Sequence, residues 1–293
     1  MASHSTGDGG IPKRGVGKNG LKRVMSLGGA YGTRNYTIKD LRDCKGKRTL
    51  VETLPFSTEE AAAAEEAGID TMKVRFDPNQ PELAANIRQA APNTFMAFSV
   101  PLVAAASEVE AVRLGYQAMS IGADAIMCQW SPKFISAAAD AGIPIQGHAG
   151  LVPRKSTWTG GLRAVGKVLD EAVWIYNEIK TLEEAGAYAV EVEVIPEQLL
   201  SEISKRTTLI TSSIGGGSGG DIQFLFAPAS FYPITRALNK DPGMTIGISQ
   251  MQPESKGSIH NGSPDPMAAP SIQPNFLSSL FDQQTLVAGM RIA

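Results

Sequence analysis

The chain has 293 residues, of which 43% are hydrophobic, and a formal net charge of −2. This length allows one barrel-sized domain or two smaller ones, and the small net charge gives no general attraction to nucleic acid or to a membrane surface. Cys44 and Cys128 form no CxxC or Cys/His pattern, so we expect neither a disulfide framework nor a structural zinc site. No apolar run is long enough to span a bilayer, and we therefore expect a soluble, cytoplasmic protein.

Residues 1–46 form a basic segment that we expect to be irregular. The first 48 residues contain eleven Lys and Arg against three Asp and Glu, together with many Gly and Ser. Two interpretations fit: an arm that packs under the following domain, or a mitochondrial transit peptide. A transit peptide usually forms an amphipathic helix, and this segment has no convincing one, so the arm is favoured.

Strand and helix patterns then alternate as far as about residue 240. Ser57 is an expected helix N-cap because Glu60 follows three residues later. Glycines end four helices just before a strand, as left-handed caps do, namely Gly68, Gly122, Gly142 and Gly186. Strands are predicted over residues 48–54, 71–76, 94–100, 125–130, 144–149, from 189, and over 208–214 and 222–226. Helices are predicted from 57, over 78–91, 107–121 and 132–141, through an apolar stripe over 169–182, and from Pro196.

Eight strands with intervening helices predict a (β/α)8 barrel over residues 47–240, with its active site at the C-terminal strand ends. The loop over residues 150–166 is longer than usual connections, which favours a functional role. A barrel needs an eighth helix, and residues 231–239 are the candidate. Residues 241–293 are rich in Pro, Ser, Gly and Gln without lasting periodicity, so we expect a disordered tail, above all over 250–274.

The strand that opens at Ala189 carries Glu191 and Glu193 on one face and valines on the other. In a closed barrel the valines meet the helices and the carboxylates point inward, where they need a chemical role or a cationic partner. A carboxylate in an apolar pocket suits a general base, and Glu193 is the best candidate. An ion pair with Lys73 or Arg75 explains the pattern equally well.

Two further stretches are candidates for the site. His148 lies at the end of a strand between Gly147 and Gly150; alone it fits a structural residue as well as a substrate ligand, and the glycines favour function. The run IGGGSGGD over residues 214–221 lies between the last two strands, where barrels often bind anions with backbone amides. A flexible loop explains the same glycines.

Three motifs resemble the ketopantoate hydroxymethyltransferase (3-methyl-2-oxobutanoate hydroxymethyltransferase) family of the phosphoenolpyruvate mutase/isocitrate lyase superfamily. The resemblance covers about residues 47–227. The sequence GHAGLVP resembles the family's GHxGLTP, EAGA followed by EVIP resembles its EAGA…ExVP, and IGGG with Asp221 and Gln223 resembles its IGAG…DGQ. These motifs lie at residues 147–153, 184–187, 193–196 and 214–217.

The resemblance implies a (β/α)8 enzyme that moves a hydroxymethyl group from 5,10-methylenetetrahydrofolate to the 2-oxo acid 3-methyl-2-oxobutanoate, in pantothenate biosynthesis. In the family a bound Mg²⁺ holds the keto acid and stabilises its enolate. Glu193 matches the base that takes the C3 proton, and His148 matches a substrate contact. Substrate contacts are also expected from Ser99, Gln129 and the glycines Gly215, Gly216 and Gly217. We expect no nucleic-acid or membrane partner, and a homo-oligomer.

The family's metal ligands are not matched. Phe76 stands at the position of the first metal-binding aspartate, with Asp77 one residue later as the remaining metal candidate. Ser99 replaces the second aspartate, and the family's KxEG reads MCQW, which puts Gln129 in place of the glutamate. Asp77 reaches a metal if the preceding strand has a one-residue bulge, a register that also turns Lys73 and Arg75 inward.

Two alternative functions are compatible with these departures. One is an enzyme that acts at carbon–carbon or carbon–phosphorus bonds of another 2-oxo acid, and the other is a catalytically silent barrel that serves as a binding protein.

Overall fold

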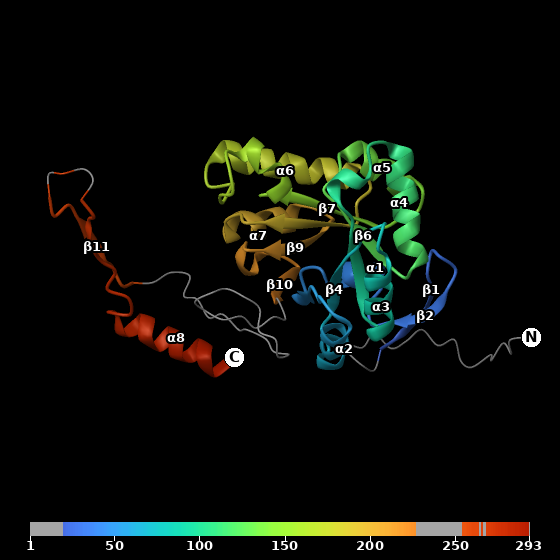
Figure 1. The fold of residues 1–293 in the computed structure, drawn as a ribbon, viewed down its shortest axis with the longest axis horizontal. Helices are drawn as coiled ribbons and strands as arrows, with labels where there is room; N and C mark the ends of the chain where they lie inside the picture. The colour runs from blue at the N-terminus through green and yellow to red at the C-terminus, as the bar shows by residue number, and fades with distance from the viewer. Residues whose placement is uncertain (1–19, 227–253, 264, 266–267, 293) are drawn as a thin grey trace, which may run out of the picture. The chain divides into compact units, whose positions relative to one another are not determined.

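The computed structural model describes residues 20–226, 254–263, 265 and 268–292. The chain divides into two compact units, residues 1–228 and 229–293, which are described separately. Figure 1 shows the first unit as a barrel of strands surrounded by helices. The candidate eighth helix over residues 231–239 lies outside the described residues.

The first unit is a closed barrel with eight parallel strands in the order β10-β3-β4-β5-β6-β7-β8-β9, which confirms the predicted (β/α)8 fold. All eight predicted strands are present, with ends that differ by a few residues. They are β3 (Leu50–Thr53), β4 (Thr71–Arg75), β5 (Phe95–Ser99), β6 (Ala125–Met127), β7 (Ile145–Gly150), β8 (Ala189–Glu193), β9 (Ile210–Ile214) and β10 (Ile222–Phe226).

The helices follow the predicted alternation. Ser57 Oγ accepts a hydrogen bond from the Glu60 amide at 3.2 Å and begins α2, as expected, and Gly68 ends this helix with φ of 84°. The other helices are α3 (Glu82–Ala90), α4 (Glu108–Ser120), α5 (Pro132–Asp140), α6 (Leu169–Glu184) and α7 (Glu197–Arg206), and α2 spans Thr58–Ala67. Short 3₁₀ turns η1 (Leu102–Ala104), η2 (Pro153–Thr159) and η3 (Gly217–Gly219) lie in the loops.

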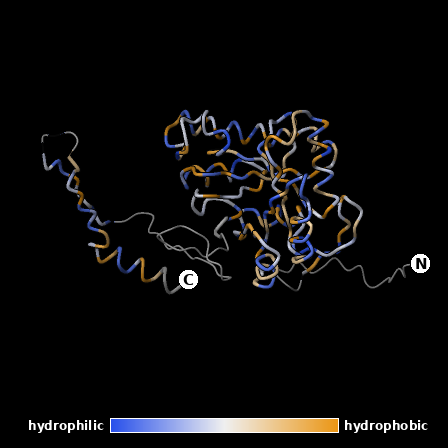
Figure 2. Tube along the Cα trace, viewed as in Figure 1, coloured by the Kyte–Doolittle hydropathy of each residue, from blue (hydrophilic) through white to orange (hydrophobic). Residues whose placement is uncertain are grey.

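Two apolar layers hold the barrel together. One lies between the strands and the helices and contains Val190 and Val192, as the alternation of the strand predicted. The other fills the half of the barrel interior near the N-terminal strand ends. Its residues are Tyr36, Leu41, Leu50, Phe95, Ala97, Ala125, Met127, Tyr188, Ala189, Ile210 and Ile222. In Figure 2 hydrophobic and hydrophilic stretches alternate along this unit, as expected for elements with one buried face.

Two segments that were expected to be irregular contain regular elements. Residues 20–46 form the hairpin β1 (Lys22–Met25) with β2 (Tyr31–Arg34), followed by α1 (Ile38–Cys44), which Thr37 and Asp40 cap reciprocally. In the second unit β11 (Ser258–His260) pairs with β12 (Ser271–Gln273), and α8 spans Leu280–Ile292. Local backbone pairing and capping, rather than a periodic apolar face, form these elements, so the sequence pattern did not reveal them.

The second unit is fixed internally by a buried carboxylate. Asp282, in the first turn of α8, is 1% exposed. Its oxygens accept hydrogen bonds from the amides of Glu254 and Ser255 at 2.9 and 2.8 Å, and from the Ser255 hydroxyl. These contacts join the segment before β11 to the helix.

Candidate active site

Five charged or titratable side chains meet in the half of the barrel interior near the C-terminal strand ends. We call them the interior charge cluster. They come from four strands: Glu52 from β3, Lys73 from β4, His148 from β7, and Glu191 and Glu193 from β8. Strand alternation turns all five inward, because each shares its parity with interior residues of the same strand. The cluster thus lies above the apolar interior layer, toward the C-terminal strand ends where barrel enzymes place their active sites.

Lys73 is paired with two carboxylates at the end of the cluster that faces the apolar interior layer. Its Nζ lies 2.9 Å from Glu52 Oε2 and also contacts Glu191 Oε2, and the lysine side chain is only 4% exposed. Glu52 also accepts hydrogen bonds from the hydroxyls of Thr71 and Ser212. Charges buried this deeply are tolerated only when they are paired and hydrogen-bonded, as these are.

The ion pair predicted from the sequence therefore exists, but it engages Glu191 rather than Glu193. Lys73 also points inward without the bulge that the sequence interpretation invoked, because β4 pairs with β5 in continuous register over all five of its residues. Glu52 was not recognised from the sequence. The signal was present, since Glu52 follows Leu50 at strand spacing inside a predicted barrel strand.

His148 and Glu193 form a contact at the top of the cluster. His148 Nε2 lies 3.1 Å from Glu193 Oε2, and its Nδ1 lies 3.3 Å from Gln129 Nε2 and 3.8 Å from Glu191 Oε1. Burial lowers the pKa of His148 despite the opposing effect of Glu193, so a neutral imidazole is favoured near pH 7. With Gln129 donating to Nδ1, the neutral ring carries its proton on Nε2, which lies close to Glu193 Oε2 without an aligned hydrogen bond.

Glu193 is the most exposed carboxylate of the interior charge cluster. Its side chain is 18% exposed, whereas those of Glu191 and His148 are 5% and 2% exposed. Val194, the next residue, has φ of 50°, a left-handed conformation that is strained for a β-branched side chain. Its amide donates to Ile214 O at 2.8 Å and its carbonyl accepts from Val165 N at 3.2 Å, which hold the turn in place. Such strain is concentrated at functional sites in proteins.

The metal positions of the family contain no suitable ligands here. Phe76 points outward into the apolar layer beneath the helices and lies beside Phe98, with ring centroids 6.2 Å apart. Ser99 and Gln129 offer only neutral oxygens. Asp77 is exposed in the loop after β4 and accepts a hydrogen bond from the Asn79 amide at 2.9 Å, so the structure does not bring it into the interior charge cluster.

The interior charge cluster contains a second set of possible metal ligands. His148, Glu191 and Glu193 each offer one ligand atom, and these atoms lie within 4.8 Å of one another. Mg²⁺ prefers an all-oxygen octahedral site, whereas this set contains an imidazole nitrogen, and the Lys73 ammonium already contacts the Glu191 carboxylate. A divalent cation beside a buried ammonium is repelled. These residues therefore do not fit the Mg²⁺ of the family.

The glycine-rich segment between β9 and β10 packs against the start of α7. Gly215 and Gly217 have φ of 62° and 70°, and a Cβ on Gly217 would meet the Glu197 side chain at 2.8 Å. The Glu197 carboxylate accepts from the amide and hydroxyl of Ser218. Because a carboxylate already occupies this amide, the segment offers less to an anion than its sequence suggests, and the tight packing differs from a flexible loop.

The long loop after β7 contains η2 and adds a cation near the cluster. Lys155, within η2, lowers the pKa of His148 through its positive charge. The same charge opposes the raised pKa of Glu178 on α6, whose main cause is burial. Trp158, also in η2, is 90% exposed. The loop thus places the positive charge of Lys155 near the His148 ring.

The fold and the cluster define a (β/α)8 barrel with charged side chains gathered toward the C-terminal strand ends. A comparison with protein families gives the family: the ketopantoate hydroxymethyltransferase model matches residues 61–229. The chain belongs to this family and is an enzyme of it.

Relatives and solved structures agree with this assignment. The chain is 30% identical over 209 residues to a 3-methyl-2-oxobutanoate hydroxymethyltransferase of Kosmotoga olearia, covering 64% of this chain and 78% of the relative. It is 31% identical over 209 residues to an enzyme of that name from Thermus thermophilus, covering 64% and 80%. A proposed phosphonomutase from Burkholderia cenocepacia J2315 shares the fold, with a TM-score of 0.53, 12% identity, and coverage of 64% and 92%.

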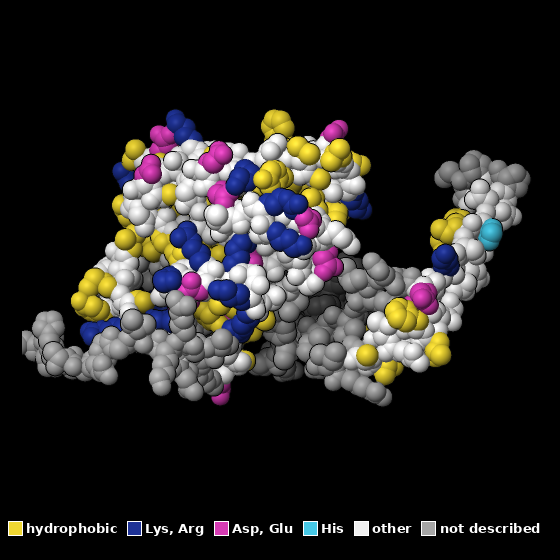
Figure 3. All heavy atoms as spheres, turned by 180° about the vertical axis from the view of Figure 1, so that it is seen from behind, with side chains coloured by type: hydrophobic (Ala, Val, Ile, Leu, Met, Phe, Trp, Pro, Cys, Tyr) yellow, Lys and Arg dark blue, Asp and Glu magenta, His cyan; other side chains and the backbone are white. Residues whose placement is uncertain are grey.

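No helix among the described residues has the length and apolar character needed to cross a bilayer. Figure 3 shows basic and acidic side chains interspersed over one face of the barrel unit. Such a mixed surface is consistent with the small net charge.

Proposed function

We propose that the chain transfers a hydroxymethyl group from 5,10-methylenetetrahydrofolate to 3-methyl-2-oxobutanoate through an enolate of the keto acid. The observation that carries this proposal is the contact between His148 Nε2 and Glu193 Oε2 on neighbouring strands at the barrel mouth. It joins two family motifs that are 45 positions apart in the sequence into one proton-handling pair.

In this mechanism Glu193 takes the proton from C3 of the keto acid, and the C3–H electron pair becomes the enolate. Water releases the one-carbon unit from the folate at the formaldehyde level, as both of its C–N bonds break and tetrahydrofolate leaves. C3 then attacks this carbon, and the alkoxide that forms takes the proton from Glu193 to give the hydroxymethyl group. His148, neutral and in contact with Glu193 through Nε2, holds the carboxylate in place beside the substrate. Glu191 lies one strand layer deeper and is bound by Lys73, so it is not placed to act as the base.

The first half of this reaction is testable without folate. A base that removes the C3 proton exchanges it with solvent, so incubation of the protein with 3-methyl-2-oxobutanoate in D₂O should place deuterium at C3, as followed by NMR. Glu193→Gln should slow the exchange by about 10² or more, the usual contribution of general-base catalysis. Glu191→Gln is the matched control, since it removes a carboxylate from the same strand face, and it should slow the exchange less.

Other outcomes separate the alternative functions. Exchange that persists undiminished in Glu193→Gln removes this residue from the mechanism. Exchange only with a different 2-oxo acid favours another reaction at a carbon–carbon or carbon–phosphorus bond. An absence of exchange with every branched and linear 2-oxo acid favours a binding barrel. We also expect a homo-oligomer, which light scattering coupled to gel filtration measures directly.

A further inference from the structure

We propose that Arg75 binds the carboxylate of the 2-oxo acid at the barrel mouth, and that this binding needs no divalent metal. The proposal rests on the proposed function, because it takes a 2-oxo acid as the ligand. It concerns a residue that neither the motif resemblance nor the proton-handling pair assigns.

The interior charge cluster creates the need for a further cation. It contains three carboxylates, those of Glu52, Glu191 and Glu193, against one ammonium, so its net charge with neutral His148 is two negative charges. An anionic keto acid that approaches Glu193 is repelled by this charge, and the repulsion grows as the enolate forms. Lys73 does not offset the negative charge at the barrel mouth, since its ammonium is buried between Glu52 and Glu191.

Arg75 is in the right place to supply that charge. It is the last residue of β4, two positions beyond Lys73, and therefore lies on the same strand face but one layer nearer the mouth. It is the register partner of Ser99, which stands at the position of a family metal ligand. Lys73 and Arg75 thus place two fixed cations on the strand that precedes the lost aspartate position at Phe76.

The guanidinium of Arg75 is available to bind an anion. Its Cζ lies 5.3 Å from the ring centroid of Phe56, in the loop after β3, so the guanidinium stacks at the barrel mouth. Among the described residues no carboxylate forms an ion pair with it, and the residue is exposed. A guanidinium that contacts an aromatic ring keeps its planar N–H donors available, and these match a carboxylate in a bidentate arrangement. The neighbouring Ser99 hydroxyl offers one more donor.

The test measures binding by isothermal titration calorimetry of 3-methyl-2-oxobutanoate to the full chain, in EDTA and again with Mg²⁺. We expect wild-type affinity in EDTA to lie within about twofold of that in Mg²⁺. Arg75→Gln should weaken binding by on the order of tenfold or more, the effect of losing a charge-assisted bidentate contact, and Arg75→Lys should fall between the two.

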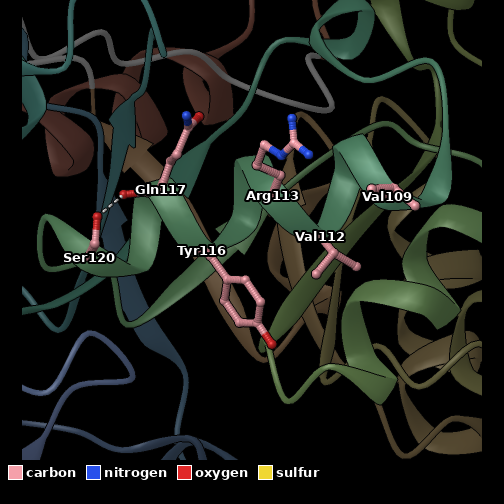
Figure 4. Close-up of a pocket in the computed structure, with 6 residues that line it drawn as sticks. All are labelled: Val109, Val112, Arg113, Tyr116, Gln117 and Ser120. Carbon is pink, nitrogen blue, oxygen red and sulfur yellow. Dashed lines mark hydrogen bonds between the residues drawn. The ribbon is translucent and has the colours of Figure 1, made fainter.

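A matched control is available on the surface. Arg113 is an exposed arginine on α4 that lines a groove of about 460 Å³ together with Val109, Val112, Tyr116, Gln117 and Ser120 (Figure 4). Arg113→Gln removes the same charge from the chain but not from the barrel mouth, and it should leave the affinity unchanged.

A neutral probe distinguishes carboxylate binding from a loss of fold. The amide of the same keto acid should bind the wild type more weakly than the acid does, and Arg75→Gln should not weaken it further. In the exchange assay Arg75→Gln should raise KM and also lower kcat, because the repulsion that grows as the enolate forms is then not offset.

The proposal is overturned if Arg75→Gln and Arg113→Gln bind the acid equally well, or if EDTA abolishes binding and Mg²⁺ restores it. Both results leave the proposed function standing when exchange at C3 is observed. A wild type that neither binds nor exchanges any 2-oxo acid contradicts the proposed function, and the role of Arg75 with it.

Discussion

The two sides of the barrel differ in how far they retain the chemistry of the family. On the side of β7 and β8, the motif residues His148 and Glu193 are present and in contact. On the side of β4, β5 and β6, the acidic positions are replaced by Phe76, Ser99 and Gln129, and β4 supplies Lys73 and Arg75 instead. Under the proposed roles, proton handling and carboxylate binding are built from different strands, so each can be altered without the other.

The largest expected effect of breaking this arrangement is on stability, through Lys73. Lys73→Met leaves Glu52 and Glu191 buried without their ammonium, and breaking a buried ion pair in this way costs about 3–5 kcal/mol. The free energy of unfolding from urea titration should fall by this amount. Adding Glu191→Gln to Lys73→Met should recover part of the loss, because one of the uncompensated charges is removed. A drop below about 1 kcal/mol in the single variant would contradict the burial of this pair.

Mg²⁺ affinity tests the side of the barrel formed by β4, β5 and β6. Because the family ligand positions hold Phe76, Ser99 and Gln129, titration with Mg²⁺ should show much weaker binding than in relatives that keep both aspartates. Asp77→Ala should change the remaining affinity little, since the Asp77 side chain is engaged with the Asn79 amide in an exposed loop. Tight binding that Asp77→Ala abolishes would show that this residue is a metal ligand after all.

A smaller effect is expected from the pH dependence of stability. Burial lowers the pKa of His148 in the folded protein, so the unfolded chain binds the proton more readily. The stability that neutral His148 contributes is fully present above its unfolded pKa of about 6.5 and is lost as the pH falls toward the folded value. Wild-type stability should therefore decline between about pH 7 and 5 more steeply than that of His148→Gln. Parallel profiles for the two proteins would contradict the burial of this ring.

The smallest effect is expected from the second unit. The hydrogen bonds of Asp282 to Glu254 and Ser255 and the pairing of β11 with β12 join residues of the second unit to one another, so we expect removal of residues 250–293 to leave the melting transition of the barrel nearly unchanged. Calorimetry of the truncated protein checks this. An insoluble or molten truncated protein would show that the barrel needs the removed segment.

The sequence predicted the barrel well because its signals are local: alternating strands, a capped helix at Ser57 and glycine caps such as Gly68. Period-two alternation also placed Glu191 and Glu193 inside. An ion pair with Lys73 was among the predictions, but its choice of Glu191 and the part taken by Glu52 were not predictable, because these residues lie on strands far apart in sequence and their contact depends on barrel closure. The hydrogen bonds of Asp282 and the pairing of β11 with β12 were not predicted for a different reason. Short polar elements leave no periodic apolar pattern in the sequence.

The most direct test of the division between the two sides is a crystal structure with 3-methyl-2-oxobutanoate, soaked in Mn²⁺ so that anomalous scattering reveals any bound metal. The account predicts the keto-acid carboxylate against the Arg75 guanidinium, C3 within reach of Glu193, and no anomalous peak among Asp77, Ser99 and Gln129. A Mn²⁺ ion bound among those three residues, with the keto acid coordinated to it and Arg75 turned away, would contradict it.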